Sequence, residues 1–314
     1  MKCLVSGATG FIGRQLCQQL VARGDTVIAL SKNGAPLSSG EPTLALDLAV
    51  SAPDVELLRG VDVFFHLAGI AHRQERKSSY EELNYQATVR LARLASAAGI
   101  RCFIFLSSVK AMGSPNSSAV RAEGACSRPV DAYGLSKWQA EVALQEQFSE
   151  DRMAVVIVRP ALVYGATVKG NLQRLATAVR WGLPRPPESG TRSMIALEDL
   201  VELLNVIAQR PPLSGVHTWI ACGVDSYSTR AIYDLLREAS GKDRGIGWLP
   251  RWVWRVGAWV LDTASGRHEE STYDKLFGTE RYSNAAVLRD TEWQPRIRLE
   301  DVIGQIVDVG SVRP

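Results

Sequence analysis

The sequence of 314 residues lacks the features that mark a membrane protein, a disulfide-rich protein or a polyanion-binding protein. Its nearest approach to a spanning helix, residues 252–261, is interrupted by Arg255 and Gly257 and has about half of the ~20 apolar residues needed. The five cysteines show no metal-ligand spacing, and their odd number favours reduced thiols in a cytoplasmic protein. The formal net charge of +3 is too small to favour nucleic acid as the main partner. We therefore expect no membrane span, no metal and no nucleic acid.

The opening segment also lacks the long apolar region and cleavage site of a secretory signal peptide, so we expect it to form part of the fold. What the sequence does contain is an ordinary globular composition, with 46% hydrophobic and 22% charged residues. A chain of this length buries roughly 75% of the surface that its unfolded form exposes. The core therefore needs no disulfides or metal to support it.

Short runs rich in β-branched residues alternate with helical patterns through the first half of the chain, which is typical of βαβ units. The predicted strands cover 3–7, 26–30, 43–47, 61–68, 102–108 and 153–160. The predicted helices lie near 11–23, 53–59, 78–98 and 132–148. Continuous hydrophobicity in 61–68 and 102–106 fits strands buried on both faces. The pattern predicts an α/β fold with a doubly wound parallel Rossmann sheet.

After Gly165 the pattern changes. A loop rich in Pro and Gly at 182–192 precedes an amphipathic helix at 197–208 and a strand at 216–221, and shorter helices and loops follow from Asp225. We expect a smaller, mostly C-terminal substrate-binding domain beside the dinucleotide-binding domain. The predicted division assigns 1–165 and 194–222 to the Rossmann domain, and 166–193 and 223–314 to the substrate domain.

Four tryptophans gather in one short segment, at positions 248, 252, 254 and 259. Tryptophans at this density are most often part of a core, so we expect them in the core of the small domain. Two alternatives stay open, a wall of the substrate pocket and an interface patch that contacts a membrane-associated partner.

Three glycines, Gly7, Gly10 and Gly13, follow the first predicted strand and open the first helix. In a dinucleotide site, such glycines permit a tight turn, a close approach of the pyrophosphate and close packing of helix on sheet. The helix N-terminus then faces the anion. A plain turn is the alternative, but the βαβ context favours a dinucleotide.

The end of the second strand reads Leu30-Ser31-Lys32-Asn33 and lacks the acidic residue that accepts a hydrogen bond from the ribose of NAD. Ser31 and Lys32 in its place favour NADP over NAD, although Lys32 also suits a solvated loop. Asp47, at the end of the next strand, is a candidate for binding the adenine amino group or for capping a helix.

Tyr133 and Lys137 lie four residues apart in a helical stretch, so both project from one face. An ammonium beside a phenol favours the phenolate, and we expect it to lower a pKa that is about 10 in a free tyrosine. Ser108 ends a buried strand, where open α/β sheets place the groups that contact ligands. Each feature alone occurs often by chance; together they suit proton transfer to or from a carbonyl or hydroxyl oxygen.

These residues, with the segments around them, resemble the extended short-chain dehydrogenase/reductase family, in its epimerase/dehydratase branch. The segments that carry the resemblance are SGATGFIG (6–13), HLAG (66–69), Asn84, FLSSVKAMG (105–113), YGLSKWQAE (133–141), RPALVYG (159–165), GNL (170–172), RSMIALEDL (192–200) and TEWQP (291–295). The resemblance implies hydride transfer with NAD or NADP, and catalysis by Ser108, Tyr133 and Lys137. It further implies a larger set of cofactor-binding residues. They are Gly7, Gly10, Phe11, Ile12, Gly13, Ser31, Lys32, Asp47, Leu48, Leu67, Ala68, Gly69 and Lys137.

On the substrate side, Asn171 and Arg192 match positions that bind the nucleoside diphosphate in this family, and Ser108 and Tyr133 would also contact substrate. Arg192 suits a diphosphate because its guanidinium is a fork of donors, although an exposed cation is the alternative. His72 and Arg73 have a solvated loop as their more ordinary interpretation. The resemblance also implies a homodimer through the helices near 78–98 and 132–148.

The reaction expected from the resemblance is at C4 of a UDP-sugar, most of all reduction of a 4-keto sugar nucleotide. A UDP-hexose 4-epimerase is the alternative, and a non-catalytic cofactor-sensing or scaffolding protein is a distant one that the intact Ser, Tyr and Lys disfavour. Dehydratases of this kind often carry Asp-Glu after the serine, whereas Val109 and Lys110 follow Ser108 here. Elimination of water is therefore not expected.

Overall fold

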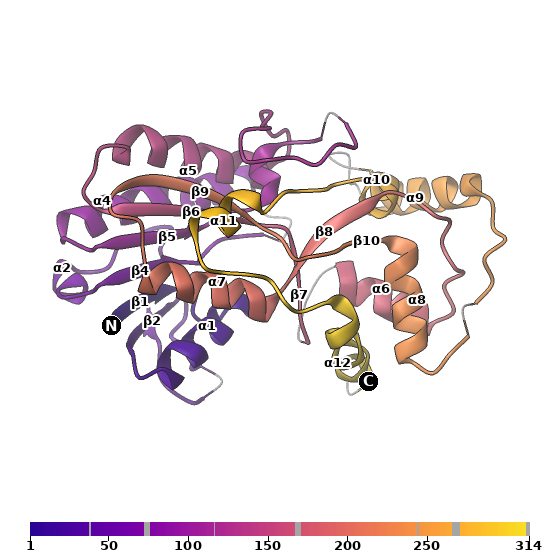
Figure 1. The fold of residues 1–314 in the computed structure, drawn as a ribbon, viewed down its shortest axis with the longest axis horizontal. Helices are drawn as coiled ribbons and strands as arrows, with labels where there is room; N and C mark the ends of the chain where they lie inside the picture. The colour runs from indigo at the N-terminus through magenta and orange to yellow at the C-terminus, as the bar shows by residue number, and fades with distance from the viewer. Residues whose placement is uncertain are drawn as a thin grey trace.

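We describe the fold from a computed structural model of the chain, which describes residues 1–37, 39–71, 76–115, 117–166, 171–243, 245–265 and 271–311. A seven-stranded sheet forms its larger part (Figure 1). Its strands are β1 (Lys2–Ser6), β2 (Thr26–Ser31), β3 (Leu44–Ala45), β4 (Val63–His66), β5 (Cys102–Leu106), β6 (Ala154–Pro160) and β9 (Gly215–Ala221).

All neighbouring strands of this sheet are parallel, and their order is β3-β2-β1-β4-β5-β6-β9. The register aligns Val5 with Ala29 on one side and Phe65 on the other. Because the chain winds outward in both directions from β1, the topological switch point lies between β1 and β4. The predicted doubly wound parallel sheet is confirmed, with shorter strands than the sequence indicated at 43–47 and 61–68.

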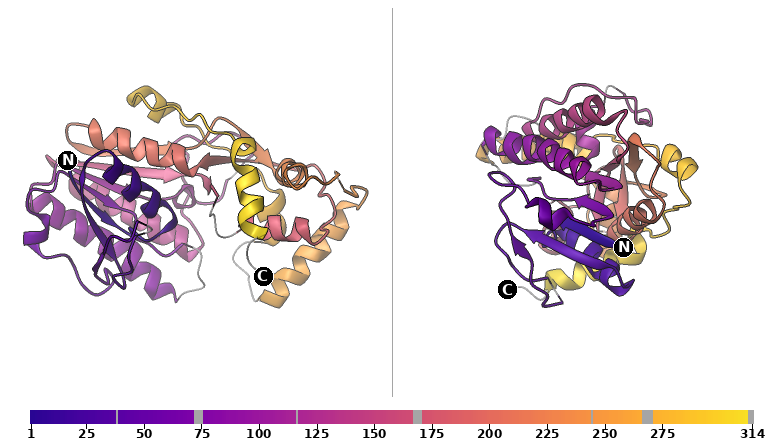
Figure 2. Two further views of the ribbon diagram at one scale, coloured as in Figure 1. Left: turned by 90° about the horizontal axis from the view of Figure 1, so that it is seen from below. Right: turned by 90° about the vertical axis from the view of Figure 1, so that its left-hand side faces the viewer.

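Helices cover both faces of the sheet. One face carries α1 (Phe11–Ala22) and α7 (Leu197–Gln209), which contact each other. The other carries α2 (Val55–Leu58), α4 (Ala87–Ala97) and α5 (Ala132–Phe148), and α4 contacts α5 (Figures 1 and 2). Each layer encloses its own apolar core, since alternate strand residues point to opposite faces. The homodimer expected through α4 and α5 stays a prediction.

Beyond the carboxyl ends of the strands lies a second, smaller part of the molecule (Figures 1 and 2). It contains a three-stranded sheet in which β8 (Thr191–Ala196) pairs with β7 (Leu162–Tyr164) and β10 (Ser226–Ser228). Its helices are α6 (Asn171–Arg180), α8 (Thr229–Ala239), α9 (Arg251–Ser265), α10 (Thr272–Phe277) and α12 (Leu299–Ser311). A separate apolar cluster holds α6, α8 and α12 against β8.

Three observations differ from what the sequence predicted for this part. The strands β7, β8 and β10 were not predicted, and α9 is longer than the short helices expected. Val287 of α11 (Ala285–Asp290) and Trp293 pack into the core beside α1 and α7, although the predicted division assigns both to the substrate domain. The division itself stays a prediction.

The expectation of a tryptophan core is wrong for three of the four residues. Trp248, Trp252 and Trp259 are exposed by 77%, 65% and 66%, and only Trp254 turns inward, where its ring meets Phe277 edge-on. The reason is the orientation of α9. This helix has apolar residues on two opposite sides, and only one of these sides packs against the molecule. No helix within the described ranges is both long and apolar enough to cross a membrane.

Candidate active site

The glycines that follow β1 form a tight turn at the switch point. Gly7 has φ of +70°, and a Cβ there would come within 2.7 Å of the Ala68 nitrogen, while a Cβ on Gly13 would come within 2.2 Å of the Gly7 oxygen. Gly10 caps α1 without a side chain, and the first turn of α1 carries no acidic residue. This backbone therefore offers unshielded N–H groups to an anion, and it fits the pyrophosphate of a dinucleotide.

The residues expected around the rest of the dinucleotide are of two kinds, polar residues at the ends of β2 and β3 and apolar residues packed in the core. Ser31 is buried and shares a hydrogen bond of 2.6 Å with the Thr43 hydroxyl, whereas Lys32 is exposed and its Nζ lies 2.9 Å from Asp47 Oδ2. The Lys32 ammonium holds the pKa of Asp47 below its usual range. Lys32 thus places a cation at this edge of the sheet, in an ion pair with Asp47. Apolar packing holds the other expected residues, which are Phe11, Ile12, Leu48, Leu67 and Ala68.

Two buried polar residues hold the chain that follows β4. His66 contacts the Ser6 hydroxyl at 2.7 Å and the Thr88 hydroxyl at 2.9 Å, and burial lowers the pKa of His66 to about 3, so the ring is neutral. Asn84 accepts from the Ile70 amide at 2.9 Å and donates to its carbonyl oxygen at 3.0 Å. Asn84 belongs to a π-helical turn, Glu81–Gln86, a feature frequent at functional sites.

Gly69 lies next to Asn84 and Lys137. A Cβ at Gly69 would come within 3.0 Å of Asn84 Oδ1 and 3.2 Å of Lys137 Nζ. An alanine at this position would crowd both groups, so the glycine gives the lysine its room.

The three expected catalytic residues come together at the carboxyl end of β5. Ser108 caps a 3₁₀-helix, Val109–Met112, and shares a side-chain hydrogen bond with Tyr133. Tyr133 lies in the first turn of α5, where Asp131 accepts from the Gly134 amide at 2.7 Å and fixes the start of the helix. The ring of Tyr80, which the sequence did not single out, lies 6.5 Å from that of Tyr133. The arrangement presents a phenol and a hydroxyl to one oxygen atom.

The pKa of Tyr133 is raised rather than lowered, in contrast to the expectation. Burial raises the pKa of Tyr133 to about 12, and the hydrogen bond from Ser108 opposes this without overcoming it. The amino group of Lys137 instead donates to the Leu106 carbonyl oxygen at 2.9 Å and lies 4.5 Å from the centre of the Phe105 ring. Burial lowers the pKa of Lys137 to about 7. At neutral pH, Tyr133 is therefore a proton donor.

The buried Lys137 gives folding stability a pH dependence of defined sign. Its pKa is lowered in the folded protein, so the unfolded chain binds more protons between about pH 7 and about pH 10.5, and stability rises with pH in that window. Lys137→Met is expected to raise the free energy of unfolding near neutral pH, and the gain should shrink toward pH 10. Urea unfolding at several pH values measures this, with exposed Lys77→Met as the control that should show no such trend.

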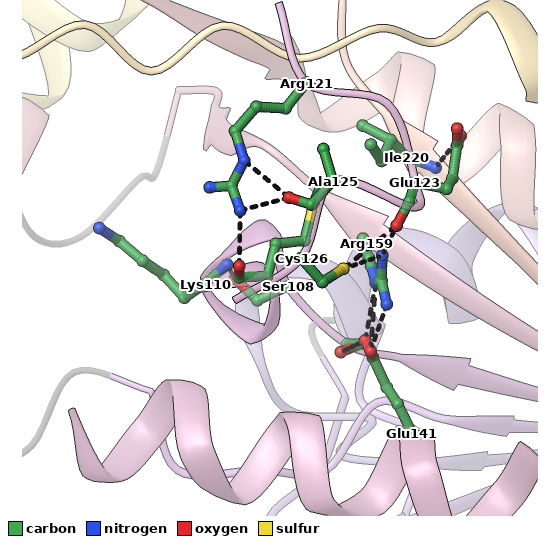
Figure 3. A network of polar contacts seen from close by, with 11 residues as sticks. Ser108, Lys110, Arg121, Glu123, Ala125, Cys126, Glu141, Arg159 and Ile220 are labelled. Carbon is green, nitrogen blue, oxygen red and sulfur yellow. Dashed lines mark hydrogen bonds and ion pairs between the residues drawn. The ribbon is translucent and has the colours of Figure 1, made fainter. Parts of the chain in front are cut away.

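Between α5 and β6 lies an ion pair that the sequence did not reveal (Figure 3). Glu141, two turns beyond Tyr133, binds Arg159 of β6 with Nη2 to Oε2 at 2.6 Å, and both side chains are almost completely buried. Ser107, next to Ser108, donates its hydroxyl to the same carboxylate. Arg159 also donates to the Glu123 carbonyl oxygen at 2.8 Å. One buried pair thus connects β5, α5, β6 and the loop above the site.

A second arginine shapes that loop. Arg121 is buried and donates to the carbonyl oxygens of Met112 at 2.5 Å, Gly113 at 2.7 Å and Ala125 at 2.6 Å (Figure 3). These bonds tie residues 121–125 to the end of the 3₁₀-helix that begins after Ser108. Cys126, which was given no catalytic role, is exposed and accepts a weak hydrogen bond from Arg159 at 3.5 Å.

The second part of the molecule reaches this site through Glu280. Its carboxylate lies 3.3 Å from Lys110 Nζ and 4.0 Å from Arg192 Nη2, so one acidic residue connects Arg192 with the 3₁₀-helix that follows Ser108. Arg192 also donates to the Asp274 carbonyl oxygen at 2.5 Å, while its Nε is buried without a hydrogen-bond partner. Asn171 begins α6, but its side chain lies outside the described residues, as do His72 and Arg73.

Close to Arg192 is a cavity of about 340 Å³. Its lining comes from Pro187, Glu188, Ser189, Gly190, Arg251, Tyr273 and Phe277. The Ser189 hydroxyl is buried without a partner, and Arg230, which pairs with Glu188 at 3.6 Å, has a buried Nε without one. The cavity lining therefore combines two aromatic rings with Arg251 and the unpartnered Ser189 hydroxyl, a combination that suits a base and a phosphate.

The sequence profile of the NAD dependent epimerase/dehydratase family matches residues 3–216. The chain belongs to this family. Of the curated proteins, a UDP-glucose 4-epimerase of Vibrio cholerae is 28% identical over 309 residues, which cover 95% of this chain and 92% of the relative. A UDP-2-acetamido-2,6-beta-L-arabino-hexul-4-ose reductase of Pseudomonas aeruginosa is 32% identical over 172 residues, 54% of this chain and 38% of the relative.

Solved structures of this family have the same fold. A UDP-glucuronic acid 4-epimerase from Bacillus cereus in complex with NAD superposes with a TM-score of 0.78 at 20% identity, covering 99% of each chain. The match supports the topology over the whole chain, including the smaller part that the sequence described least well.

Proposed function

We propose that this member of the epimerase/dehydratase family reduces a 4-keto sugar nucleotide, of the UDP-sugar class, to the 4-hydroxy form. The observation that carries the proposal is the half-buried Tyr133 phenol, which is hydrogen-bonded to Ser108 at the carboxyl end of β5. A protonated phenol suits reduction of a ketone, because the developing alkoxide needs a proton donor.

In this proposal, a bound nicotinamide dinucleotide supplies the hydride that the ketone carbon receives. Ser108 donates a hydrogen bond that orients the ketone oxygen, and Tyr133 transfers its phenolic proton to that oxygen as the C–O double bond becomes single. Lys137, with a pKa of about 7, supplies positive charge beside Tyr133 when protonated and helps to stabilise the phenolate left behind.

The nucleotide of the substrate is proposed to bind in the cavity near Arg192. Ser189, which lines the cavity, has a buried donor without a partner, and so do Arg192 and Arg230 outside the lining; diphosphate oxygens would satisfy such donors. Tyr273 and Phe277, whose ring centres are 4.8 Å apart, provide aromatic surface for a base. Lys110 occupies a position where dehydratases of this family often have an acid, and its ion pair with Glu280 supports reduction over elimination.

The named activities of the relatives support chemistry at C4. The Vibrio cholerae relative is named as a 4-epimerase and the Pseudomonas aeruginosa relative as a reductase of a 4-keto sugar nucleotide. Epimerisation is the second candidate, because the same three residues can remove and return a proton at the C4 oxygen. The Vibrio cholerae relative, which matches nearly the whole chain, is the observation that favours it.

For the cofactor, we propose a preference for NADP within this NAD dependent family, carried by Lys32 at the end of β2. The Ser31 hydroxyl is engaged with Thr43, and the exposed Lys32 ammonium, which pairs with Asp47 at 2.9 Å, would exchange or share that partner to meet a 2′-phosphate. Lys32→Gln is expected to raise KM for NADPH about tenfold and to leave KM for NADH unchanged. Steady-state kinetics with both cofactors test this, and equal changes for the two would contradict it.

The experiment that separates reduction from epimerisation uses the purified chain, a UDP-4-keto-6-deoxy sugar and NADPH. Reduction predicts oxidation of one nicotinamide per sugar, followed by absorbance, and a 4-hydroxy product seen by mass spectrometry. No oxidation over a long incubation, together with interconversion of UDP-hexoses without added reductant, would establish the epimerase instead.

A further inference from the structure

The helix α9 presents an apolar face to solvent. Trp252, Val256, Trp259 and Val260 are exposed by 65%, 51%, 66% and 50%, and their spacing of four, seven and eight residues places them on one side of the helix. We call these four side chains the α9 outer face. This spacing is typical of a helix side packed against a core, yet here it faces outward.

The opposite side of α9 is already occupied. Ala258 is buried and Trp254 meets Phe277 of α10 edge-on. Arg255 is exposed on the flank next to the outer face, 5.2 Å from the centre of the Tyr273 ring. The helix is therefore fixed to the molecule through its inner side, so the α9 outer face keeps its orientation. Both views place α9 at the outer edge of the smaller part, on the side away from the seven-stranded sheet (Figures 1 and 2).

The loop before α9 extends this surface. Ile246 and Trp248 are exposed by 62% and 77%. Residues 245–261 together contain four of the eight tryptophans of the chain, and they contain no Asp or Glu. Their only charged residues are Arg251 and Arg255. The whole chain has nearly equal numbers of acidic and basic residues. The tryptophan-rich segment 245–261 differs, because its charged residues are all basic.

We propose that the α9 outer face, with Ile246 and Trp248, docks on the surface of an anionic lipid bilayer. Tryptophan is the side chain that most favours the boundary between headgroups and acyl chains, and arginines beside it attract anionic headgroups. The surface is a projecting helix at the edge of the molecule, the shape that lies in the plane of a bilayer. The helix is too short and too polar on its flank to span one.

Docking through α9 would also orient the candidate active site. Arg251, the first residue of α9, lines the cavity near Arg192 and donates to the Glu188 carbonyl oxygen at 3.0 Å. The cavity would then lie next to the headgroup layer. The docking proposal is independent of the reaction, because it depends on none of Ser108, Tyr133 and Lys137.

The test is flotation of the full chain with vesicles of phosphatidylcholine alone and of phosphatidylcholine mixed equally with phosphatidylglycerol. The wild type is expected to float with the mixed vesicles far more than with the neutral ones, and added salt should weaken binding because it screens charge. Trp252→Gln/Trp259→Gln is expected to lower the bound fraction at least about tenfold, since two interfacial anchors are lost.

The matched control is Leu213→Gln/Val50→Gln, which makes the same kind of change at residues exposed by 97% and 81% near the larger sheet. It should bind vesicles as the wild type does, and circular dichroism should show that both double variants fold. Wild type that floats with neither vesicle or equally with both, or undiminished binding of the tryptophan variant, would overturn the proposal. So would light scattering that shows a dimer converted to a monomer by that variant, since the face would then bind a second copy.

Discussion

Tyr133→Phe is expected to lower kcat for ketone reduction by about 10²- to 10⁴-fold, because it removes the only atom from which the phenol can donate a proton. The variant keeps the ring beside Tyr80 and loses only the hydroxyl that bonds to Ser108. Binding of the dinucleotide, measured by calorimetry, should stay within a few-fold of the wild type. A fall in kcat without loss of cofactor binding is the expected signature.

Two comparisons make this result specific to the proton donor. Tyr85→Phe removes a hydroxyl from a half-buried tyrosine packed in the core beside α4, and it should leave kcat unchanged. Ser108→Ala should lower kcat less than Tyr133→Phe does, because the proton donor remains. Full kcat in Tyr133→Phe would refute its role as proton donor. A Tyr133→Phe variant that keeps its full cellular function without ketone reduction would instead favour a cofactor-binding protein that does no chemistry at this site.

Glu141→Ala is expected to destabilise the fold by about 3 to 5 kcal/mol, because it leaves the Arg159 guanidinium buried without its anion. The Ser107 hydroxyl would lose its acceptor at the same time. Urea unfolding at neutral pH measures the loss. Because Glu141 lies in α5 with Tyr133 and Lys137, we also expect the variant to have a lower kcat than the wild type.

A double variant of Glu141 and Arg159 serves as the control for the ion pair. Glu141→Leu/Arg159→Met removes both charges, and it is expected to be more stable than either single variant since no charge remains buried alone. Glu146→Ala, an exposed acid on the same helix, should change stability by no more than about 0.5 kcal/mol. A Glu141→Ala loss as small as that of Glu146→Ala would contradict the assigned importance of the ion pair.

The sequence predicted the larger sheet because its strands are long, apolar and separated by helical patterns. It missed β7 and β10 because three residues are too few to show a period, and β8 because it follows directly on a Pro/Gly loop. It also placed the tryptophans of α9 wrongly, since residues on both sides of that helix are apolar. Hydrophobicity alone does not tell which side of such a helix is buried.

The candidate site was predicted where residues lie close in sequence, as Tyr133 and Lys137 do in one helix. The groups that support it come from distant segments. Glu141 and Arg159 are 18 residues apart in the sequence, and Lys110 and Glu280 are 170 residues apart, so no local sequence pattern indicates either ion pair. The sign of the Tyr133 pKa shift was missed for the same reason, because it depends on burial that only the fold reveals.

Transfer of deuterium is the measurement that most directly tests hydride transfer to C4 of a sugar nucleotide. A UDP-4-keto-6-deoxy sugar is incubated with the protein and NADPH deuterated on each face of the nicotinamide in turn, and the product is analysed by proton NMR. We predict that one of the two cofactors places deuterium at C4 of the sugar and that Tyr133→Phe forms almost none of this product. A sugar product without deuterium from either cofactor, or with deuterium at another carbon, would contradict the account.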